Sequence, residues 1–237
     1  MSAEKKQVPS VWTRPQRRVR EQPALSRDQI VTEALALLDD AGIEALSMRK
    51  LGTRLNAGAT SLYTHVANKD ELIELVVDLV YGEIEVPAGG SGDGGGEGGA
   101  WRDAAALSAY SLRAMVLRHP WVASVLGQVG LAGLGPNVMR MSERMQVLFE
   151  GAGLASEEAG LAISALTSYV VGMAVSEGAY LSMIARSGMS EREFVKSVVS
   201  EEETAVLADP EKAREEKFDY GLQLVLDGLA GRVSPRR

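Results

Sequence analysis

Apolar residues recur at helical spacing along most of the chain, and no segment of useful length alternates apolar and polar residues as a half-buried strand does. The first repeat begins after Ser26, which together with Gln29 has the form of a helix-capping box. Apolar positions then follow at intervals of three or four residues until Gly42, a residue that favours a helix end. The pattern predicts an all-α fold whose first helix lies between Ser26 and Gly42.

Two short helices separated by a tight turn are predicted next. Ser47 caps the first of them, and its apolar positions share one face (Met48, Leu51, Leu55). Asn56-Ala57-Gly58 forms the turn, because asparagine and glycine tolerate left-handed backbone angles. The second short helix is expected at about 59–66.

The rest of the chain predicts further helices, most of them with a recognisable start. Asn68 with Glu71, Ser156-Glu157-Glu158, Ser190 with Glu193, and Asp209-Pro210-Glu211 all have the composition of helix N-termini. Helices are expected at about 69–85, 101–118, 120–126, 136–151, 156–182 and 211–229. Residues 88–99 (AGGSGDGGGEGG) are predicted to form a flexible loop, because glycine loses too much backbone entropy in a regular element.

Basic residues concentrate near the start of the chain, although the formal net charge is −7. Residues 1–27 carry a net charge of +5, residues 45–69 carry +4 without any acid, and the remainder carries −16. A basic front on an acidic body is expected where one face meets phosphates. A solvated tail explains residues 1–27 equally well, but it explains the acid-free stretch less well.

The composition restricts the chemistry that the chain can perform. Because it has no cysteine, disulfides, thiolate metal sites and a cysteine nucleophile are excluded. With only His65 and His119 a histidine-rich metal site is unavailable, so neither a metal nor a cofactor is expected. No apolar run reaches the roughly 18 residues of a membrane span, and the start lacks a signal peptide's apolar stretch. We expect a cytoplasmic protein with no membrane partner.

Enzyme motifs are not evident. The chain lacks G-x-S-x-G, H-E-x-x-H and G-x-x-x-x-G-K-[ST], and its G-x-G-x-x-G match at Gly90, Gly92 and Gly95 follows no predicted strand. We therefore do not expect an enzyme.

The segment from Ser47 to Lys69 has the form of a helix-turn-helix, in which the second helix enters the DNA major groove. Leu51, Leu55 and Leu62 would pack the two helices on each other and on the first helix. That packing leaves polar side chains facing outward, where they can reach base edges and phosphates (Thr60, Ser61, Tyr63, Thr64, His65).

These motifs resemble the N-terminal domain of the tetracycline-repressor (TetR) family. The phrases "IVTEALALLDDAGIEALSMRKLGTRL" and "SLYTHVANKDELIELV" carry the resemblance, and the ending "FDYGLQLVLDGLAGRV" more loosely resembles the family's C-terminal domain. The resemblance covers about residues 27–231 and implies a helix-turn-helix domain at 26–85 with a linker helix at about 69–85, and a ligand-binding and dimerisation domain at 101–231. The composition predicts a disordered basic arm at 1–25 and a Gly-rich loop at 86–100, and a tail is left at 232–237.

The same resemblance implies a transcriptional regulator, most simply a repressor. It would bind a palindromic double-stranded DNA operator as a homodimer through its two long C-terminal helices, and an unidentified small-molecule effector would release it. The position that matches the metal-binding histidine of the tetracycline repressor is about Leu126, so tetracycline–magnesium is not the expected effector. The alternatives are a helical ligand-binding or protein-interaction module that does not bind an operator and, least favoured, an enzyme.

The resemblance also assigns site residues. The expected DNA-binding residues are Arg49, Thr60, Ser61, Tyr63, Thr64, His65 and Lys69, with Lys69 pairing with a phosphate. The candidate pocket residues are Tyr110, Met115, His119, Trp121, Met141, Met145, Tyr169, Met173 and Glu177, for each of which an ordinary place in the core is the competing interpretation.

Overall fold

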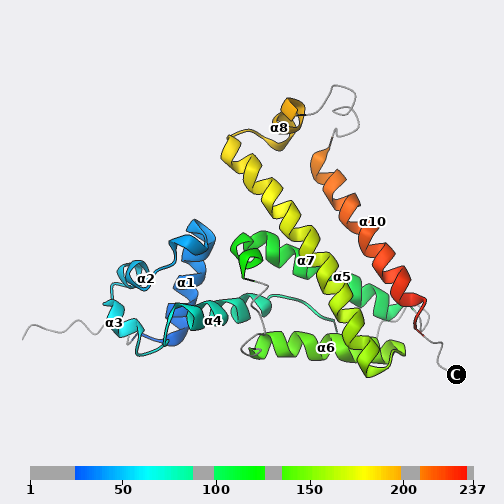
Figure 1. Cartoon of the computed structure of the whole chain (residues 1–237), viewed down its shortest axis with the longest axis horizontal. Coiled ribbons are helices and arrows are strands. Elements are labelled where there is room, and N and C mark those ends of the chain that lie inside the picture. Colours follow the sequence, from blue (N-terminus) through cyan, green and yellow to red (C-terminus); the bar gives the residue numbers. More distant parts are fainter. Residues whose placement is uncertain (1–24, 88–98, 126–134, 199–208, 234–237) are drawn as a thin grey trace, which may run out of the picture.

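The computed structural model describes residues 25–87, 99–125, 135–198 and 209–233, and within these ranges it contains helices and no strand (Figure 1). The first elements are α1 (Arg27–Ala41), η1 (Ile43–Ala45), α2 (Met48–Arg54), α3 (Ala59–Leu62) and α4 (Lys69–Tyr81). They are followed by α5 (Ala100–Arg118), η2 (Pro120–Ser124), α6 (Pro136–Ala152), α7 (Ser156–Ser187), α8 (Glu191–Val198) and α10 (Pro210–Ala230). The all-α prediction is confirmed. Most of the predicted arm (1–25), of the predicted Gly-rich loop (86–100) and of the tail (232–237) lies outside the described residues.

The predicted helix starts are present as hydrogen bonds. The Ser26 hydroxyl accepts from the Gln29 amide at 3.1 Å, and the Gln29 side chain accepts from the Ser26 amide at 3.0 Å, so the capping box is complete. The Asn68 side chain accepts from the Glu71 amide at 2.8 Å. These bonds satisfy amide groups that have no partner within a helix, which is why the sequence signals located the helix starts well.

Helix ends agree less well with the predictions. Helix α3 ends at Leu62 rather than near Val66, because the following residues close into a turn in which the His65 amide bonds to the Leu62 carbonyl at 2.9 Å. Helix α4 ends at Tyr81, and Gly82 caps it through short-range bonds to the carbonyls of its last turn. Helix α7 runs five residues beyond the predicted end near 182, to Gly188 in the left-handed conformation. Its N-cap is Ala155, so the expected capping role of Ser156 is wrong.

The helices form an N-terminal head (α1–α4) and a larger body (α5–α10), which share a continuous apolar core. In the head, α1 packs against α2 and α4 around Ile30, Leu37, Leu51, Leu62 and Leu72, each with no exposed surface. In the body, α7 packs against α5, α6 and α10. Helix α4 leads from the head to α6 (Figure 1), where the Asp78 carboxylate accepts the amides of Asn137 and Val138 at 2.9 and 3.1 Å.

The turn of the helix-turn-helix depends on two backbone positions. Asn56 has a φ of 51°, in the left-handed region that asparagine tolerates better than most residues. Gly52 lies inside α2, and its carbonyl accepts the Ala57 amide at 2.8 Å. A Cβ atom at Gly52 would lie 2.7 Å from the Ala57 carbonyl oxygen, so the turn can fold back on α2 only because a glycine is there.

Helix α7 is unusually apolar for a helix whose surface is mostly uncovered. Among the described residues it is the helix long and apolar enough to cross a membrane, with a mean hydropathy of 1.6 over 18 residues and 28% of that window buried. The core helix of a soluble protein passes the same test. The buried positions that include Leu166, Val170 and Ala174 face α5, α6 and α10, so much of the remaining apolar surface has no partner in the described part of the chain.

Candidate DNA interface and small-molecule cavity

A polar surface surrounds the single turn of α3. Thr60, Ser61 and Thr64 are exposed, Tyr63 is 52% exposed, and the side chain of His65 is half-buried. The next inward-facing residue, Leu62, has no exposed surface, and Val66 is 2% exposed. The apolar residues therefore fix the turn on the head, and the polar side chains face outward. The Thr64 hydroxyl donates to the Ser61 carbonyl at 2.7 Å, so toward an external partner it can act only as an acceptor.

Cations lie at the starts of α2 and α4, the helices before and after α3 in the chain. Arg49 and Lys50 are exposed at the start of α2, and neither forms an ion pair among the described residues. Lys69 is half-buried at the start of α4, where its ammonium lies 3.4 Å from the Ile43 carbonyl oxygen. Arg54 differs from the others, because it pairs within the head with Glu33 at 2.5 Å and with Asp40 at 3.5 Å. In the acid-free stretch 45–69, Arg54 is therefore paired within the head, whereas Arg49 and Lys50 form no ion pair among the described residues.

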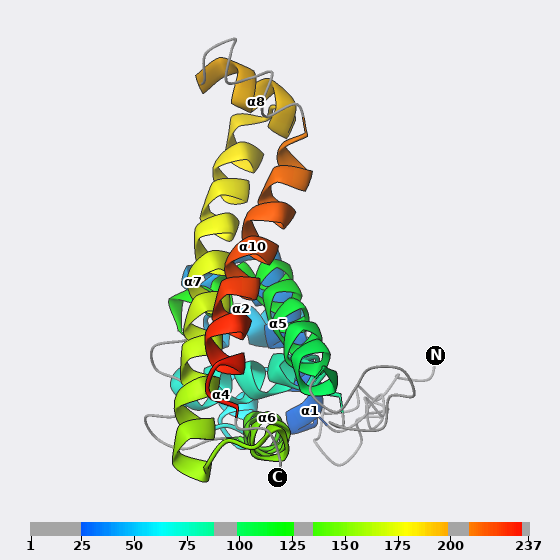
Figure 2. The ribbon, with the colours of Figure 1, turned by 90° about the vertical axis from the view of Figure 1, so that its right-hand side faces the viewer.

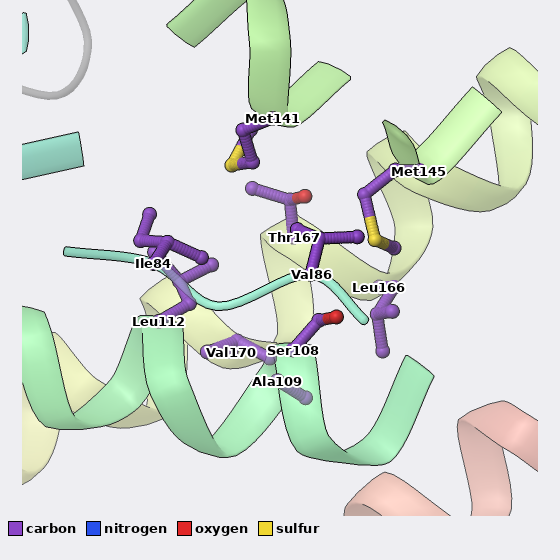
Figure 3. Close-up of a pocket in the computed structure, with 10 residues that line it drawn as sticks. All are labelled: Ile84, Val86, Ser108, Ala109, Leu112, Met141, Met145, Leu166, Thr167 and Val170. Carbon is purple, nitrogen blue, oxygen red and sulfur yellow. The ribbon is translucent and has the colours of Figure 1, made fainter. Parts of the chain in front are cut away.

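A second candidate site is a small apolar cavity in the body (Figure 3). It lies between α5, α6, α7 and the extended segment that follows α4, and its volume is about 20 Å³. That volume holds about one water molecule. Its lining consists of Ile84, Val86, Ser108, Ala109, Leu112, Met141, Met145, Leu166, Thr167 and Val170.

The cavity offers few polar groups to an occupant. None of the described residues that line it is charged, and the Ser108 hydroxyl is already used, since it donates to the Ala104 carbonyl at 2.8 Å. Thr167 supplies the other hydroxyl. Ligand pockets for drug-sized molecules measure roughly 300–1,000 Å³, so an occupant must displace part of the wall. Met141 and Met145, which are unbranched and adaptable, are the side chains best suited to move.

The pocket residues expected from the sequence are divided among several places. Met141 and Met145 line the cavity. Met115 is part of the core and Met173 packs against it. Tyr110 and Tyr169 contact the Phe218 ring on α10, and the Tyr169 hydroxyl donates to the Phe218 carbonyl at 2.7 Å. Glu177 pairs with Arg113, whose guanidinium lies over the same ring. His119 and Trp121 contact Asp39 on α1.

Glu177 is the centre of an ion-pair network between α5, α7 and α10. Its side chain is 10% exposed and binds Arg113 through two bonds of 2.7 and 2.8 Å, and Arg214 at 3.1 Å. Burial alone would raise the pKa of Glu177, but the hydrogen bonds and charges of Arg113 and Arg214 outweigh it and lower the pKa. Arg214 also pairs with Glu191 on α8. These contacts give Glu177 a role in packing α10 onto α7.

Tyr110 has a structural partner as well. Its hydroxyl donates to Asp219 on α10 at 2.6 Å. Burial and this hydrogen bond raise the pKa of Tyr110 to about 12, and the same bond lowers the pKa of Asp219. The bond therefore joins α5 to α10.

Most residues of the cavity wall were missed by sequence reasoning. Ser108, Ala109 and Leu112 lie in the predicted α5, and Leu166, Thr167 and Val170 lie in the predicted α7, but apolar spacing does not distinguish a cavity wall from a filled core. Ile84 was assigned to a helix that ends before it, and Val86 was assigned to the Gly-rich loop. In the described ranges no group of three or more His, Asp or Glu side chains could hold a metal ion. Leu126, the expected counterpart of the metal-binding histidine, lies outside the described residues.

Comparison with known proteins identifies both parts of the chain. The model of bacterial regulatory proteins of the tetR family matches residues 30–76, and the model of the tetracyclin repressor-like C-terminal domain matches residues 95–233. An HTH-type transcriptional regulator of Saccharopolyspora erythraea is 38% identical over 72% of this chain and 69% of its own length. The HTH-type transcriptional repressor DrrR1 of Streptomyces coeruleorubidus is 34% identical over 91% of this chain and 81% of its own.

Solved structures have the same arrangement of helices. ActR of Streptomyces coelicolor in complex with actinorhodin is 31% identical, with a TM-score of 0.69 over 90% of this chain and 99% of that one. BioQ with its double-stranded DNA operator is 26% identical, with a TM-score of 0.61 over 87% of this chain and 99% of that one.

Proposed function

Because the chain belongs to the TetR family of bacterial transcriptional regulators, we propose that it is a repressor which binds a palindromic operator as a homodimer and leaves it when a small molecule occupies the body. The observation that carries this proposal is the outward polar surface of α3 held in place by the buried Leu62. It would act in the cytoplasm, where its DNA is accessible. We propose no catalytic activity, since its relatives are named as regulators.

The recognition surface combines base readout with backbone contacts. Thr60, Ser61, Tyr63, Thr64 and His65 form the face that would enter the major groove, where hydroxyl and imidazole groups can distinguish base edges. Arg49 near the start of α2 and Lys69 at the start of α4 would bind phosphates, which position the protein without reading sequence. The solved complex of BioQ with its operator supports this use of the fold.

Replacing single residues of this surface is expected to weaken operator binding. Tyr63→Ala should weaken it about tenfold or more, because one good base or phosphate contact contributes roughly 1–3 kcal/mol. Lys69→Ala should also reduce the slope of log affinity against log salt by about 0.9 for each phosphate that the protein no longer neutralises. Fluorescence anisotropy with DNA from upstream of the gene, titrated at several salt concentrations, measures both quantities.

Lys212→Ala is the matched control for the lysine variant. Lys212 lies on α10, its side chain is 68% exposed, and its pairing partner Glu216 is equally exposed. Its removal should change neither the affinity nor the salt slope measurably. Unchanged operator affinity in both Tyr63→Ala and Lys69→Ala would show that α3 is not the DNA-binding surface.

The homodimer is proposed to form through α7 and α10, which lie side by side across one face of the body (Figure 2). The positions of α7 opposite its buried side are small or apolar and follow helical spacing (Leu161, Ser168, Gly172, Val175, Ala179, Met183). On α10, Tyr220 and Leu224 are 70% and 57% exposed. A second copy would cover this apolar surface and place two recognition surfaces on one operator, as a two-fold interface requires.

The effector is proposed to enter the cavity between α5, α6 and α7. Its apolar, uncharged lining favours a neutral ring system over a charged molecule, because a buried charge without a partner is strongly disfavoured. The structure of ActR in complex with actinorhodin shows that a protein of this fold can bind a small molecule. Occupancy would expand the wall and favour a state of the dimer with lower operator affinity.

Two probes that share a ring system test the chemistry of the cavity. 2-Naphthol is expected to bind at least tenfold more tightly than 2-naphthoate, because no charged side chain among the described lining residues compensates the carboxylate. Ala109→Leu should abolish naphthol binding, since Ala109 lines the cavity. Isothermal titration calorimetry gives both affinities.

In the control Ala106→Leu the same change is made three residues away, outside the lining, and binding should persist. Equal affinity for the two probes would refute the proposed selectivity.

A further inference from the structure

The head and the body meet at a buried histidine. His119 caps the end of α5, and its side chain is 4% exposed. Its Nδ1 atom lies 2.7 Å from a carboxylate oxygen of Asp39, near the end of α1. The Trp121 indole nitrogen donates to the same Asp39 oxygen, also at 2.7 Å. The Asp39 carboxylate of the head is therefore held by the imidazole and the indole ring of the body, at the point where α1 packs on η2.

The other side of the imidazole faces a second carboxylate. The Nε2 atom of His119 lies 3.3 and 3.4 Å from the two carboxylate oxygens of Glu83, which follows α4. Glu83 also pairs with Arg118, the residue before His119. The charged and titratable groups that face His119 are thus Asp39 from α1, Glu83 from the segment after α4, and Arg118 from the end of α5.

The two distances show which of the two carboxylate contacts of His119 is stronger. A carboxylate only accepts hydrogen bonds, so each contact needs an N–H of the imidazole. The distance of 2.7 Å to Asp39, against 3.3 Å to Glu83, assigns a ring N–H to the Asp39 side. Hydrogen bonds to an ionised acceptor are short and directional. Asp39 is therefore held firmly and Glu83 more loosely.

Glu83 connects this contact to the cavity along the backbone. It immediately precedes Ile84, and both Ile84 and Val86 line the cavity. Ile84 and Val86 are 8% and 4% exposed, so they form a packed wall that a bound molecule would push aside. A displacement of the backbone at Ile84 would also move the adjacent Glu83, which is the second carboxylate that faces His119.

We propose that Asp39, Glu83 and His119 form a clamp that fixes the orientation of the head on the body and transmits occupancy of the cavity to α1. The side chains of Asp39 and Glu83 are 33% and 32% exposed, so water can replace either contact when the clamp opens. The apolar core of the head does not have to unfold for this rearrangement. The inference rests on the proposed function, since it supplies the coupling between effector and operator.

A double-mutant cycle without any ligand tests the clamp. Ala109→Leu fills the cavity from α5 and should displace its wall, lowering operator affinity roughly tenfold, within the usual range of allosteric coupling. In an Asp39→Ala background the clamp is already open, so Ala109→Leu should cause no further decrease. Asp39→Ala itself should leave the salt slope unchanged, because it removes no group that binds a phosphate.

Asp40→Ala is the control, because it removes the same charge from the next position of α1. The Asp40 side chain is 74% exposed and contacts Arg54 at 3.5 Å, away from His119. The tenfold effect of Ala109→Leu should persist in this background. If Asp39→Ala does not fold, as judged by circular dichroism, Asp39→Leu takes its place in the same cycle with the same expectation, because leucine has a similar size and accepts no hydrogen bond.

Two results would overturn the clamp. One is an effect of Ala109→Leu that is undiminished in the Asp39 variant, and the other is no effect of Ala109→Leu on operator affinity in the unmodified chain. Both are distinguishable from failure of the proposed function, in which the unmodified chain itself would not bind the operator.

Discussion

A chain carrying Val175→Glu and Leu224→Glu is expected to be monomeric and to bind the operator roughly 100-fold more weakly, or worse. Val175 on α7 and Leu224 on α10 are 37% and 57% exposed on the apolar face proposed for the dimer. A carboxylate at each position would be buried against its counterpart in the second copy, at a cost that the interface cannot offset. Once the copies separate, each recognition surface binds without the gain in effective concentration that the pair provides.

Sedimentation equilibrium and operator titration of the same preparations measure this result. Val147→Glu is the matched control, since Val147 is 67% exposed but lies on α6. It should remain dimeric and keep its operator affinity. A double variant that is still dimeric would place the interface elsewhere.

Glu177→Ala is expected to destabilise the fold by about 1–3 kcal/mol, because it removes the shared partner of two part-buried guanidinium groups, of which Arg214 keeps its pair with Glu191. The variant leaves Arg113 and Arg214, whose side chains are 13% and 20% exposed, without their shared carboxylate. Urea unfolding followed by circular dichroism gives the free energy of unfolding. The control is Glu216→Ala, because the Glu216–Lys212 pair is 68% exposed on both sides and should contribute less than about 1 kcal/mol.

The same carboxylate gives the stability a dependence on pH. Because the folded protein lowers the pKa of Glu177, the contribution of Glu177 is complete above the ordinary glutamate pKa of about 4.3 and is lost as the pH falls through the lowered value. The unmodified chain should therefore lose stability in this acidic range faster than Glu177→Ala. Equal stability of the two chains near neutral pH would show that the network does not hold α10 on α7.

Local signals made most of the fold predictable. Capping residues such as Ser26 and Asn68 bond to backbone amides three positions away, so the same short stretch of sequence defines both the cap and the helix start. The outward face of α3 was also predictable, because Leu62 had to point inward. Helix ends were less predictable from the sequence, because the end of α4 depends on where the buried Ile84 and Val86 pack.

The cavity and the clamp were not predictable, because both consist of residues brought together from distant segments. His119 lies 80 positions from Asp39, and its contact depends on how η2 packs against α1. Glu177 was expected to line a pocket, but it binds two arginines from other helices, and no local pattern indicates which partners a buried glutamate finds. Periodicity identifies the helices, whereas their tertiary packing decides which of their residues line a cavity.

A footprint of the purified protein on the DNA upstream of its gene tests whether the α3 surface binds the operator. We expect a protected segment with two-fold symmetry, whose two halves are contacted in successive major grooves, and loss of that protection in Tyr63→Ala at the same protein concentration. No protected segment, or protection that Tyr63→Ala leaves unchanged, would contradict the claim that the α3 surface binds the operator.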